Sequence, residues 1–399
     1  MLETTIRELL DVLLRWVHLV AGIMWVGNSL LFNWLDRNLE KDESKGPRHV
    51  GRIWLLHSGG YYDVEKTFLA PDQMPRTLHW FKWQSYTTWM SGVALLALLY
   101  WTSGASLMID PSVMRLTSGQ AVGIGVGTVV LGWLLYDGAW RLFGRFERAA
   151  TLASIAFVAA VIWGLTHVLS GRAAFIHVGA MLGTCMAGNV FMHIVPSQRE
   201  LVAATLSGKP QDVAVAASKH AKQRSIHNNY LTFPLLFTML SNHFSVITGS
   251  KWSAVLLGVL FVGGAMVRHW LNVRFTFKAW IPALAATITV ALGAVAAVVL
   301  AGSPAGVSAG GERVAWTTAQ GILQQRCNPC HSDHPTIESN PPAPSIVRFG
   351  TPDEIAMWKE RIAARAVVTR TMPLNNRTEM TDDERDTLGR WLAQGAPTQ

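Results

Sequence analysis

Residues 280–301, WIPALAATITVALGAVAAVVLA, contain no charged side chain. A bilayer core about 30 Å thick needs roughly 20 apolar residues per helical crossing, so this segment predicts a membrane-spanning helix. The composition changes abruptly after it. Residues 302–311, GSPAGVSAGG, are small and polar, which is typical of a flexible linker. Residues 312–399 then have the composition of an ordinary water-soluble domain.

Seven further apolar runs of similar length precede this one. They are residues 12–33, 80–102, 118–137, 149–169, 173–195, 229–249 and 253–272. Half of the 399 residues are hydrophobic, only 15% are charged, and 17 are tryptophan, a composition that is unusual for a soluble protein. We therefore predict an all-α fold, with an eight-helix transmembrane bundle in residues 1–301, a linker at 302–311 and a small soluble domain at 312–399.

The net charge of +8 comes from loops between the apolar runs, because the C-terminal domain is nearly neutral. Lysine and arginine are abundant in every second connection, beginning with the one between the first and second runs. The positive-inside rule places these loops in the cytoplasm. We therefore predict a multi-pass protein of the bacterial inner membrane, with the N-terminus and the C-terminal domain in the periplasm. Basic residues distributed in this way do not indicate a nucleic-acid partner.

The C-terminal domain contains the most specific motif. Cys327, Cys330 and His331 form the pattern Cys-x-x-Cys-His, the attachment signature of a c-type haem. The two sulfurs bond covalently to the porphyrin, and the adjacent histidine ligates the iron. A zinc site or a redox pair of cysteines is the alternative interpretation.

A second axial ligand for this haem is predicted about forty residues downstream. Met372 lies in the sequence TMPL, where the following proline fixes the loop, and its thioether can reach the other face of the iron and raise the potential. Met380 is the rival ligand. It lies at the entrance of a predicted helix and is therefore less suited to this role.

Two helices are predicted to enclose the haem motif. The first, 314–326, leads into it, and the second, 382–394, begins with a capping box formed by Thr381 and Glu384. Trp391 on the second helix can pack against the first. This order of helix, haem motif, methionine loop and terminal helix resembles a small class I cytochrome c.

Histidines are the main candidate ligands for haem inside the bundle, because ionisable side chains within membrane segments are costly and therefore indicate function. His177 and His193 are sixteen residues apart, as are His227 and His243. Antiparallel helices could pair His177 with His243 and His193 with His227, which predicts one or two haem b groups. However, a separation of sixteen residues at about 100° per residue places His177 and His193 on nearly opposite faces of a helix. The same holds for His227 and His243. Hydrogen bonding between helices is the alternative role for each histidine.

His18 is the best single candidate for a haem b ligand. In WVHLVAGIMWVG, Gly22 lies four residues and Trp25 seven residues further on, so a histidine, a gap and an aromatic ring share one helix face. A flat macrocycle would fit there. The alternative interpretation is close helix packing at the glycine.

The whole arrangement resembles the bacterial membrane-bound urate hydroxylases, also called membrane urate oxidases of the PuuD type. The resemblance rests on WVHLVAGIMWVGNSLLFNWLDRNL at 16–39, the HSGGYYDVEK loop at 57–66, LHWFKWQSYTTWMSG at 78–92 and the CNPCH motif. It implies that urate is oxidised by water to 5-hydroxyisourate. It also implies that the electrons leave through haem c to a soluble cytochrome c or a terminal oxidase.

A pocket for urate, a planar anion, should offer a cation, hydrogen-bond donors and aromatic rings. The start of the second apolar run supplies Arg76, His79 and Lys82 among several aromatic residues, so these three are the predicted catalytic residues. A nearby histidine or carboxylate can take the proton from the attacking water. The alternative is that they are ordinary membrane-interface residues, since such side chains are enriched at helix ends.

Two other functions are compatible with the sequence. The first is a non-catalytic electron-transfer cytochrome that links a partner dehydrogenase to periplasmic acceptors; it requires haem but no small-molecule pocket. The second is a transporter whose tail senses the redox state, which requires no cofactor in the bundle.

Overall fold

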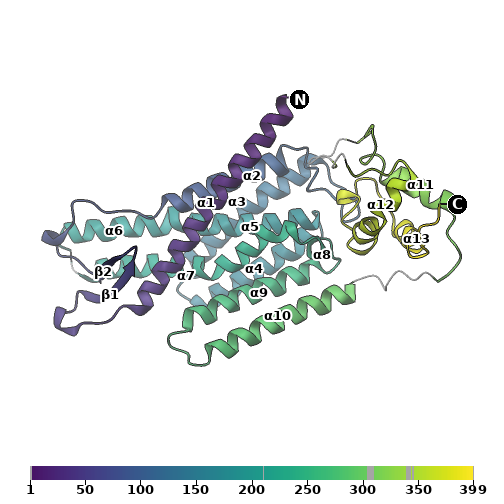
Figure 1. Cartoon of the computed structure of the whole chain (residues 1–399). Helices are drawn as coiled ribbons and strands as arrows, with labels where there is room; N and C mark the ends of the chain where they lie inside the picture. Colours follow the sequence, from purple (N-terminus) through teal and green to yellow (C-terminus); the bar gives the residue numbers. More distant parts are fainter. Residues whose placement is uncertain (1, 210, 303–309, 338–342, 344–345, 399) are drawn as a thin grey trace. The chain divides into compact units, whose positions relative to one another are not determined.

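The computed structural model describes residues 2–209, 211–302, 310–337, 343 and 346–398. Most of the predicted linker, residues 303–309, therefore lies outside the described residues. The chain is mainly helical (Figure 1). Its α-helices are α1 (Leu2–Asn38), α2 (Trp83–Leu96), α3 (Ser118–Phe143), α4 (Glu147–Thr166), α5 (Gly171–Asn189), α6 (Val195–Leu206), α7 (Gln211–Leu240), α8 (Ser245–Thr248), α9 (Ser253–Val273), α10 (Trp280–Gly302), α11 (Trp316–Arg326), α12 (Pro352–Ile362) and α13 (Asp382–Ala393).

Six helical segments in the described part of the chain are long and apolar enough to cross a membrane. They are Thr5–Asn38, Ser118–Phe143, Glu147–Thr166, Gly171–Leu206, Ser253–Val273 and Trp280–Ala301. Each coincides with one of the eight predicted runs. The other two runs have a different form: α2 has only 14 residues before a π-helical turn, and α7 begins well before its apolar part and ends at Leu240. Eight crossings therefore remain a prediction.

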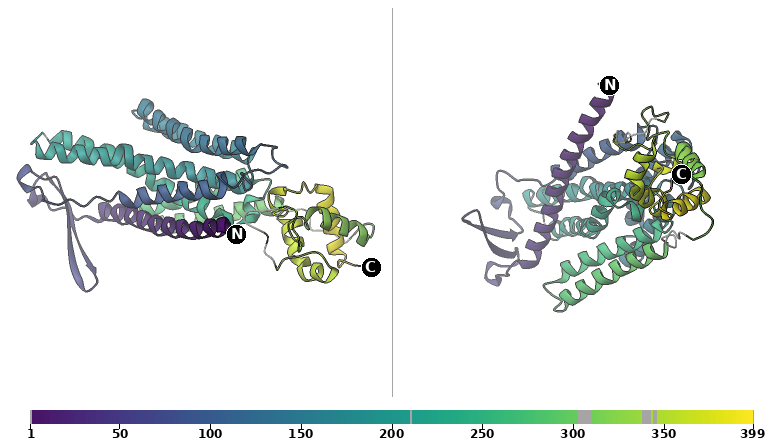
Figure 2. Two further views of the ribbon diagram at one scale, coloured as in Figure 1. Left: turned by 90° about the horizontal axis from the view of Figure 1, so that it is seen from above. Right: turned by 45° about the vertical axis from the view of Figure 1, so that its right-hand side comes forward.

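The prediction of an all-α fold is wrong at one place. The connection between the first two apolar runs contains an antiparallel hairpin of β1 (His49–His57) and β2 (Gly60–Thr67). Its two turn residues, Ser58 and Gly59, have φ angles of 51° and 75°. Positive φ at both positions is the geometry of a tight hairpin turn, so the glycine-rich loop predicted here joins two strands. Figure 2 (left) shows the hairpin extending away from the helices of its own unit.

The chain divides into two compact units, which are described separately. Unit 1 contains α1, the hairpin, α6 and nearly all of α2, together with parts of α5, α7, α9 and α10. Unit 2 contains α3, α4, α8, the remaining helix parts and the C-terminal domain. The boundaries are Met1–Leu95, Leu182–Leu235 and Gly264–Thr287 for unit 1, and Leu96–Met181, Leu236–Gly263 and Ile288–Gln399 for unit 2.

The C-terminal domain has a hydrophobic core of its own, around which α11, α12 and α13 gather (Figure 1). The predicted helices are confirmed: α11 begins two residues later than expected, and α13 ends one residue earlier. Trp391 is fully buried and lies 5.7 Å, centroid to centroid, from Trp316 of α11, so the predicted packing between these helices is also confirmed. The core comprises Val314, Ala319, Ile322, Leu323, Phe349, Ile355, Ile362, Ala366, Met380, Leu388 and Trp391.

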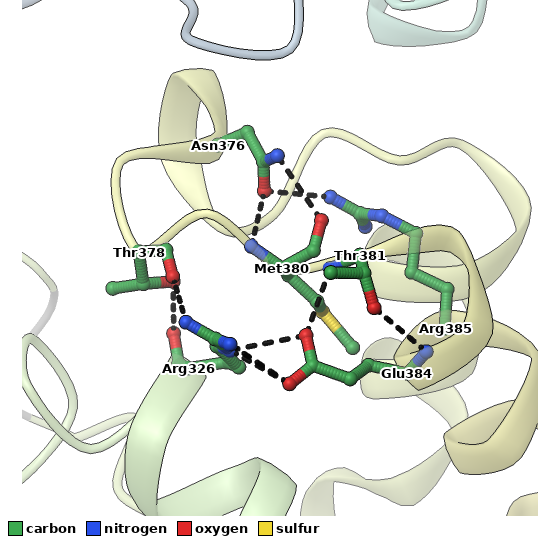
Figure 3. A network of polar contacts seen from close by, with 7 residues as sticks. All are labelled: Arg326, Asn376, Thr378, Met380, Thr381, Glu384 and Arg385. Carbon is green, nitrogen blue, oxygen red and sulfur yellow. Dashed lines mark hydrogen bonds and ion pairs between the residues drawn. The ribbon is translucent and has the colours of Figure 1, made fainter.

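An ion pair connects the end of α11 to the start of α13 (Figure 3). The Arg326 Nε and Nη2 atoms donate to the Glu384 carboxylate at 2.9–3.0 Å, and Nη1 donates to the Thr378 carbonyl. Glu384 also accepts the backbone N–H of Thr381 at 2.8 Å, which confirms the predicted capping box. Burial acts to raise the pKa of the Glu384 carboxyl, but Arg326 and the Thr381 amide outweigh it and the pKa is lowered.

We expect Glu384→Gln to loosen this junction at neutral pH. Since the folded-state pKa of Glu384 is depressed, its charge stabilises the fold above the ordinary glutamate pKa, and this contribution is lost as the pH falls through the lower folded value. Losing about 1 kcal/mol should raise amide exchange in α13 about fivefold at pH 7. Hydrogen–deuterium exchange on the full chain measures this. The ratio of variant to wild-type exchange should shrink toward one below about pH 4.

Asp386→Asn is the matched control, because Asp386 is an exposed carboxylate on the same helix. It should exchange like the wild type throughout. Equal exchange in Glu384→Gln and wild type at pH 7 would show that the ion pair does not hold the two helices together.

Candidate functional site

The predicted haem-attachment residues lie in one turn at the end of α11. The His331 N–H donates to the Cys327 carbonyl at 3.0 Å, which brings the first cysteine and the histidine close together. The imidazole Nδ1 lies 3.0 Å from the Val347 carbonyl and donates to it, and the ring packs 5.1 Å from that of Phe349. A metal-binding histidine normally donates its second ring N–H to a fixed acceptor in this way. The Nε2 atom of His331 is therefore the one available to a metal.

The two cysteines are in surroundings that disfavour a thiolate. Burial raises the pKa of the Cys327 thiol to about 12 and also raises the pKa of Cys330. Redox-active and zinc-binding cysteines need the ionised form. Within the described residues, no group of three or more histidine, cysteine or acidic side chains is arranged to hold a metal ion. Thioether attachment leaves no thiol to ionise, so these surroundings are compatible with it.

The two methionine candidates have different environments. Met380 is 3% exposed within the domain core, and Asn376 holds its backbone through reciprocal hydrogen bonds of 3.0 and 3.1 Å. Met372 is only partly buried, and its carbonyl accepts a 2.7 Å hydrogen bond from the buried Arg385 guanidinium. The backbone of the Met372 loop is thus fixed while its side chain is outside the core cluster.

His18 contacts α2 within unit 1. Its Nδ1 lies 2.9 Å from the Thr88 carbonyl and 3.2 Å from the Ser91 hydroxyl, and a Cβ on Gly92 would come within 2.8 Å of the imidazole Cε1. The close packing at a glycine expected from the sequence therefore exists, although it involves Gly92. The bond to Thr88 orients the ring as in metal-binding histidines. A cavity of about 500 Å³ lies between α1 and α2, lined mainly by Trp16, Val17, Val20, Ala21, Met24, Trp83, Gln84 and Thr87.

His177 is fully buried in unit 2 with both ring nitrogens engaged. Its Nδ1 lies 2.8 Å from the Ala173 carbonyl, and its Nε2 accepts from the Trp101 indole at 3.2 Å. His243, by contrast, is exposed in the turn that follows α7. No hydrogen bond or ring contact joins the two histidines in the described part of the chain.

His193 contacts a histidine that the sequence analysis did not consider. It is buried in a π-helical turn, Val190–Ile194, and its Nδ1 lies 3.2 Å from Nε2 of His220. His227, the predicted partner, is half-buried two helical turns further along α7. His220 was missed because the apolar run was taken to start at residue 229, whereas the helix begins at Gln211.

The three predicted catalytic residues all lie in the segment that precedes α2. Arg76 and His79 are exposed in the irregular segment before α2. The Lys82 ammonium lies 6.0 and 5.8 Å from the ring centroids of Trp80 and Trp83. No hydrogen bond joins any two of the three residues in the region that the structure describes. Their surroundings resemble those of membrane-interface residues.

A buried polar cluster in unit 1 was not anticipated. We call it the arginine–asparagine cluster; none of its side chains is more than 6% exposed, and it comprises Asn189, Arg224, Asn228, Asn229, Arg268 and Asn272 from α5, α7 and α9. A sequence pattern could have indicated this cluster. Arg224 and Asn228, and likewise Arg268 and Asn272, are spaced i, i+4 and therefore share one face of their helix. The cluster was not predicted, because histidines were the only candidate ligands considered inside the bundle.

The α5–α7 side of this cluster is a chain of amide contacts. The Asn189 Nδ2 donates to Asn228 Oδ1 at 2.9 Å, and the Asn228 Nδ2 donates to the Met186 carbonyl, also at 2.9 Å. Arg224 Nη1 donates to Asn189 Oδ1 at 3.4 Å. Both polar atoms of Asn228 are thus used within the protein.

The α7–α9 side is centred on Asn229. Its Oδ1 accepts from the Arg268 Nε at 3.0 Å and from the Asn272 Nδ2 at 2.7 Å. One residue further along each helix, the Tyr230 hydroxyl lies 2.9 Å from the His269 Nδ1. A cation, two amides, a phenol and an imidazole therefore occupy neighbouring positions on two adjacent helices.

We expect Asn228→Leu to destabilise the purified protein by about 2 kcal/mol, since the side chain loses its two buried hydrogen bonds, to the Asn189 amide and to the Met186 carbonyl. Chemical denaturation in detergent measures this loss. Replacing both asparagines by leucine should cost less than the sum of the two single replacements, because their shared hydrogen bond is then lost only once. A double variant as unstable as the sum of the two single ones would show that the amides do not interact.

Comparison with known families agrees with these observations. The profile of the family described as Urate oxidase N-terminal matches residues 4–301. No curated protein and no solved structure matches the chain. The matched region covers well over half of the sequence and includes every helix of the arginine–asparagine cluster. The chain therefore belongs to the urate oxidase N-terminal family.

Proposed function

We propose that this chain is a membrane-bound urate hydroxylase of the PuuD type, a cytochrome-linked enzyme that oxidises urate with water. The reaction is urate + H2O → 5-hydroxyisourate + 2 H⁺ + 2 e⁻, so the oxygen comes from water and no peroxide forms. One observation carries the proposal: a urate oxidase family domain at 4–301 and a haem-attachment motif at 327–331 occur in the same chain.

The haem would be held by the C-terminal domain. Cys327 and Cys330 would bond to it through their sulfurs, and His331 and Met372 would ligate its iron, with Met380 as the alternative to Met372. Haem c supplies one-electron transfer when bound. The chain's own contribution is orientation: Val347 fixes the His331 ring, and Arg385 fixes the backbone of the Met372 loop.

For the bundle we propose one haem b, with His18 as its ligand. The support is the bond of Nδ1 to the Thr88 carbonyl, which leaves Nε2 for a metal. His193 and His227 remain further candidates. His177 has both nitrogens in protein contacts, so it fits a packing role better than ligation, and His243 is exposed.

The proposed location is the bacterial inner membrane, with the N-terminus and the cytochrome domain in the periplasm. The support is the alternation of basic and non-basic loops together with the long apolar helices. A soluble cytochrome c or a terminal oxidase would accept the electrons one at a time, because a single haem c carries one.

We expect anaerobic urate to reduce the haem of the purified protein and to yield 5-hydroxyisourate. Cys327→Ala/Cys330→Ala should abolish both the covalent haem signal in a pyridine haemochrome assay and the oxidation of urate with an added acceptor. Cys185→Ala is the control, since Cys185 is buried in α5 and has no proposed role. A fully loaded protein whose spectrum does not respond to urate would contradict the enzymatic proposal and favour the non-catalytic electron-transfer protein.

The intramembrane haem is tested at the contact of His18 with Gly92. In Gly92→Ala the new methyl group would lie 2.8 Å from the imidazole, so the ring must move. We expect the extractable haem b signal to fall at least tenfold, as in His18→Ala, while covalent haem c is kept. Gly27→Ala is the matched control on α1, because no atom lies within 4 Å of the added Cβ. Haem b content that is unchanged in His18→Ala would exclude this ligand.

A further inference from the structure

We propose that Arg268, Asn229 and Asn272 form the binding site for the urate anion, an inference that rests on the proposed function. These three residues are the α7–α9 side of the arginine–asparagine cluster. All are in unit 1, and none is more than 5% exposed. The proposal moves substrate binding away from the exposed segment of Arg76, His79 and Lys82 to a desolvated position between two helices.

The first argument is the charge of Arg268. In the part of the chain that the structure describes, its single hydrogen bond is the one from Nε to Asn229, and no carboxylate forms an ion pair with it. A buried guanidinium without a counter-ion is costly, because its hydration is lost and nothing compensates the charge. An anionic ligand supplies the missing charge and can accept from the two terminal nitrogens.

The second argument is an unused acceptor beside this donor. The Oδ1 atom of Asn272 is buried and accepts no hydrogen bond, although its Nδ2 donates to Asn229. A buried acceptor without a partner indicates a missing donor. The ligand should therefore carry both a negatively charged oxygen for Arg268 and a hydrogen-bond donor, N–H or O–H, for Asn272.

Urate has these properties in one planar molecule. It is an anion at neutral pH, and carbonyl oxygens alternate with N–H groups around its rings. The Phe233 ring lies 5.8 Å from the Arg268 Cζ, in a cation–π contact that helps to fix the position of the guanidinium. Inorganic phosphate and lipid phosphates match the charge but not the N–H donor or the flat shape.

The other side of the cluster also contains a buried cation, Arg224, which donates to Asn189 Oδ1. The amides of Asn189 and Asn228 bond to each other, and Asn228 also bonds to the Met186 carbonyl. These groups connect α5 to α7. The α7–α9 side, by contrast, retains an unbonded acceptor next to a buried cation.

Proton transfer would be served by the adjacent pair. The Tyr230 hydroxyl and the His269 Nδ1 are 2.9 Å apart, and each residue directly follows a member of the site in sequence. An imidazole at this position is a general base of suitable basicity for an attacking water. The site therefore combines anion binding with a proton acceptor nearby.

The test is equilibrium binding of radiolabelled urate to the full-length haem-loaded protein, kept anaerobic and reduced with dithionite. Reduced haem accepts no electrons, so urate binds without being consumed. We expect Arg268→Gln and Asn272→Asp each to weaken binding at least 30-fold. The new aspartate acts as an internal anion that pairs with Arg268 and competes with urate. Arg274→Gln is the control on the same segment and should bind urate like the wild type.

Two further measurements distinguish a urate site from a general anion site and from a merely structural role of Arg268. Methylguanidinium should restore binding to Arg268→Ala, which shows that the site is otherwise intact. Inorganic phosphate should fail to displace urate; equal competition would identify a general anion or lipid-phosphate site and overturn the proposal. Wild-type affinity in Arg268→Gln would overturn this assignment alone, whereas absence of urate binding by the wild type would overturn the proposed function as well.

Discussion

Polar groups buried in the helical part of this chain must find partners inside the protein, because hydrocarbon offers none. This requirement explains the contacts in unit 1. Asparagines of α5 and α7 bond to each other, and Asn229 of α7 accepts from both Arg268 and Asn272 of α9. Where the requirement is not met, at Asn272 Oδ1 and around Arg268, the protein has a place for a ligand of complementary chemistry. The same rule thus accounts for both helix association and the proposed site.

The apolar helices were predictable from sequence because hydropathy is a sum over about 20 residues and tolerates local errors. Residues 280–301, for example, are helical as predicted. The start of α7 was not predictable in this way. Its first half contains Lys219, His220 and Arg224, so it has no hydropathy signal even though the helix is continuous. The hairpin was not predicted, because the glycines in residues 49–67 were taken to indicate a loop. The alternation of side chains that indicates strands was not considered there.

In the C-terminal domain, too, some features were predictable from the sequence and others were not. The haem motif, the helix before it and the capping box at Thr381 depend on local sequence, and all three could be located without a structure. The contacts of Arg326 with Glu384 and of Arg385 with the Met372 carbonyl join residues 13–58 positions apart. Pairings over that distance depend on the packing of the whole domain. Contacts between distant residues were even harder to predict in the bundle, because the hydrogen-bond partners of His18 and His193 lie on other helices.

The length of α7 affects how buried groups of the protein can exchange protons with water. Its 30 residues extend about 45 Å, whereas the hydrocarbon layer is about 30 Å thick, so a substantial part of the helix must lie among headgroups or beyond them. The charged first half is the part suited to that position. Oxidation of urate by water releases two protons for every two electrons. If the proposed function is correct, the charged first half of α7, which leads to Asn229 and Tyr230, would offer the released protons a polar way out that differs from the route of the electrons.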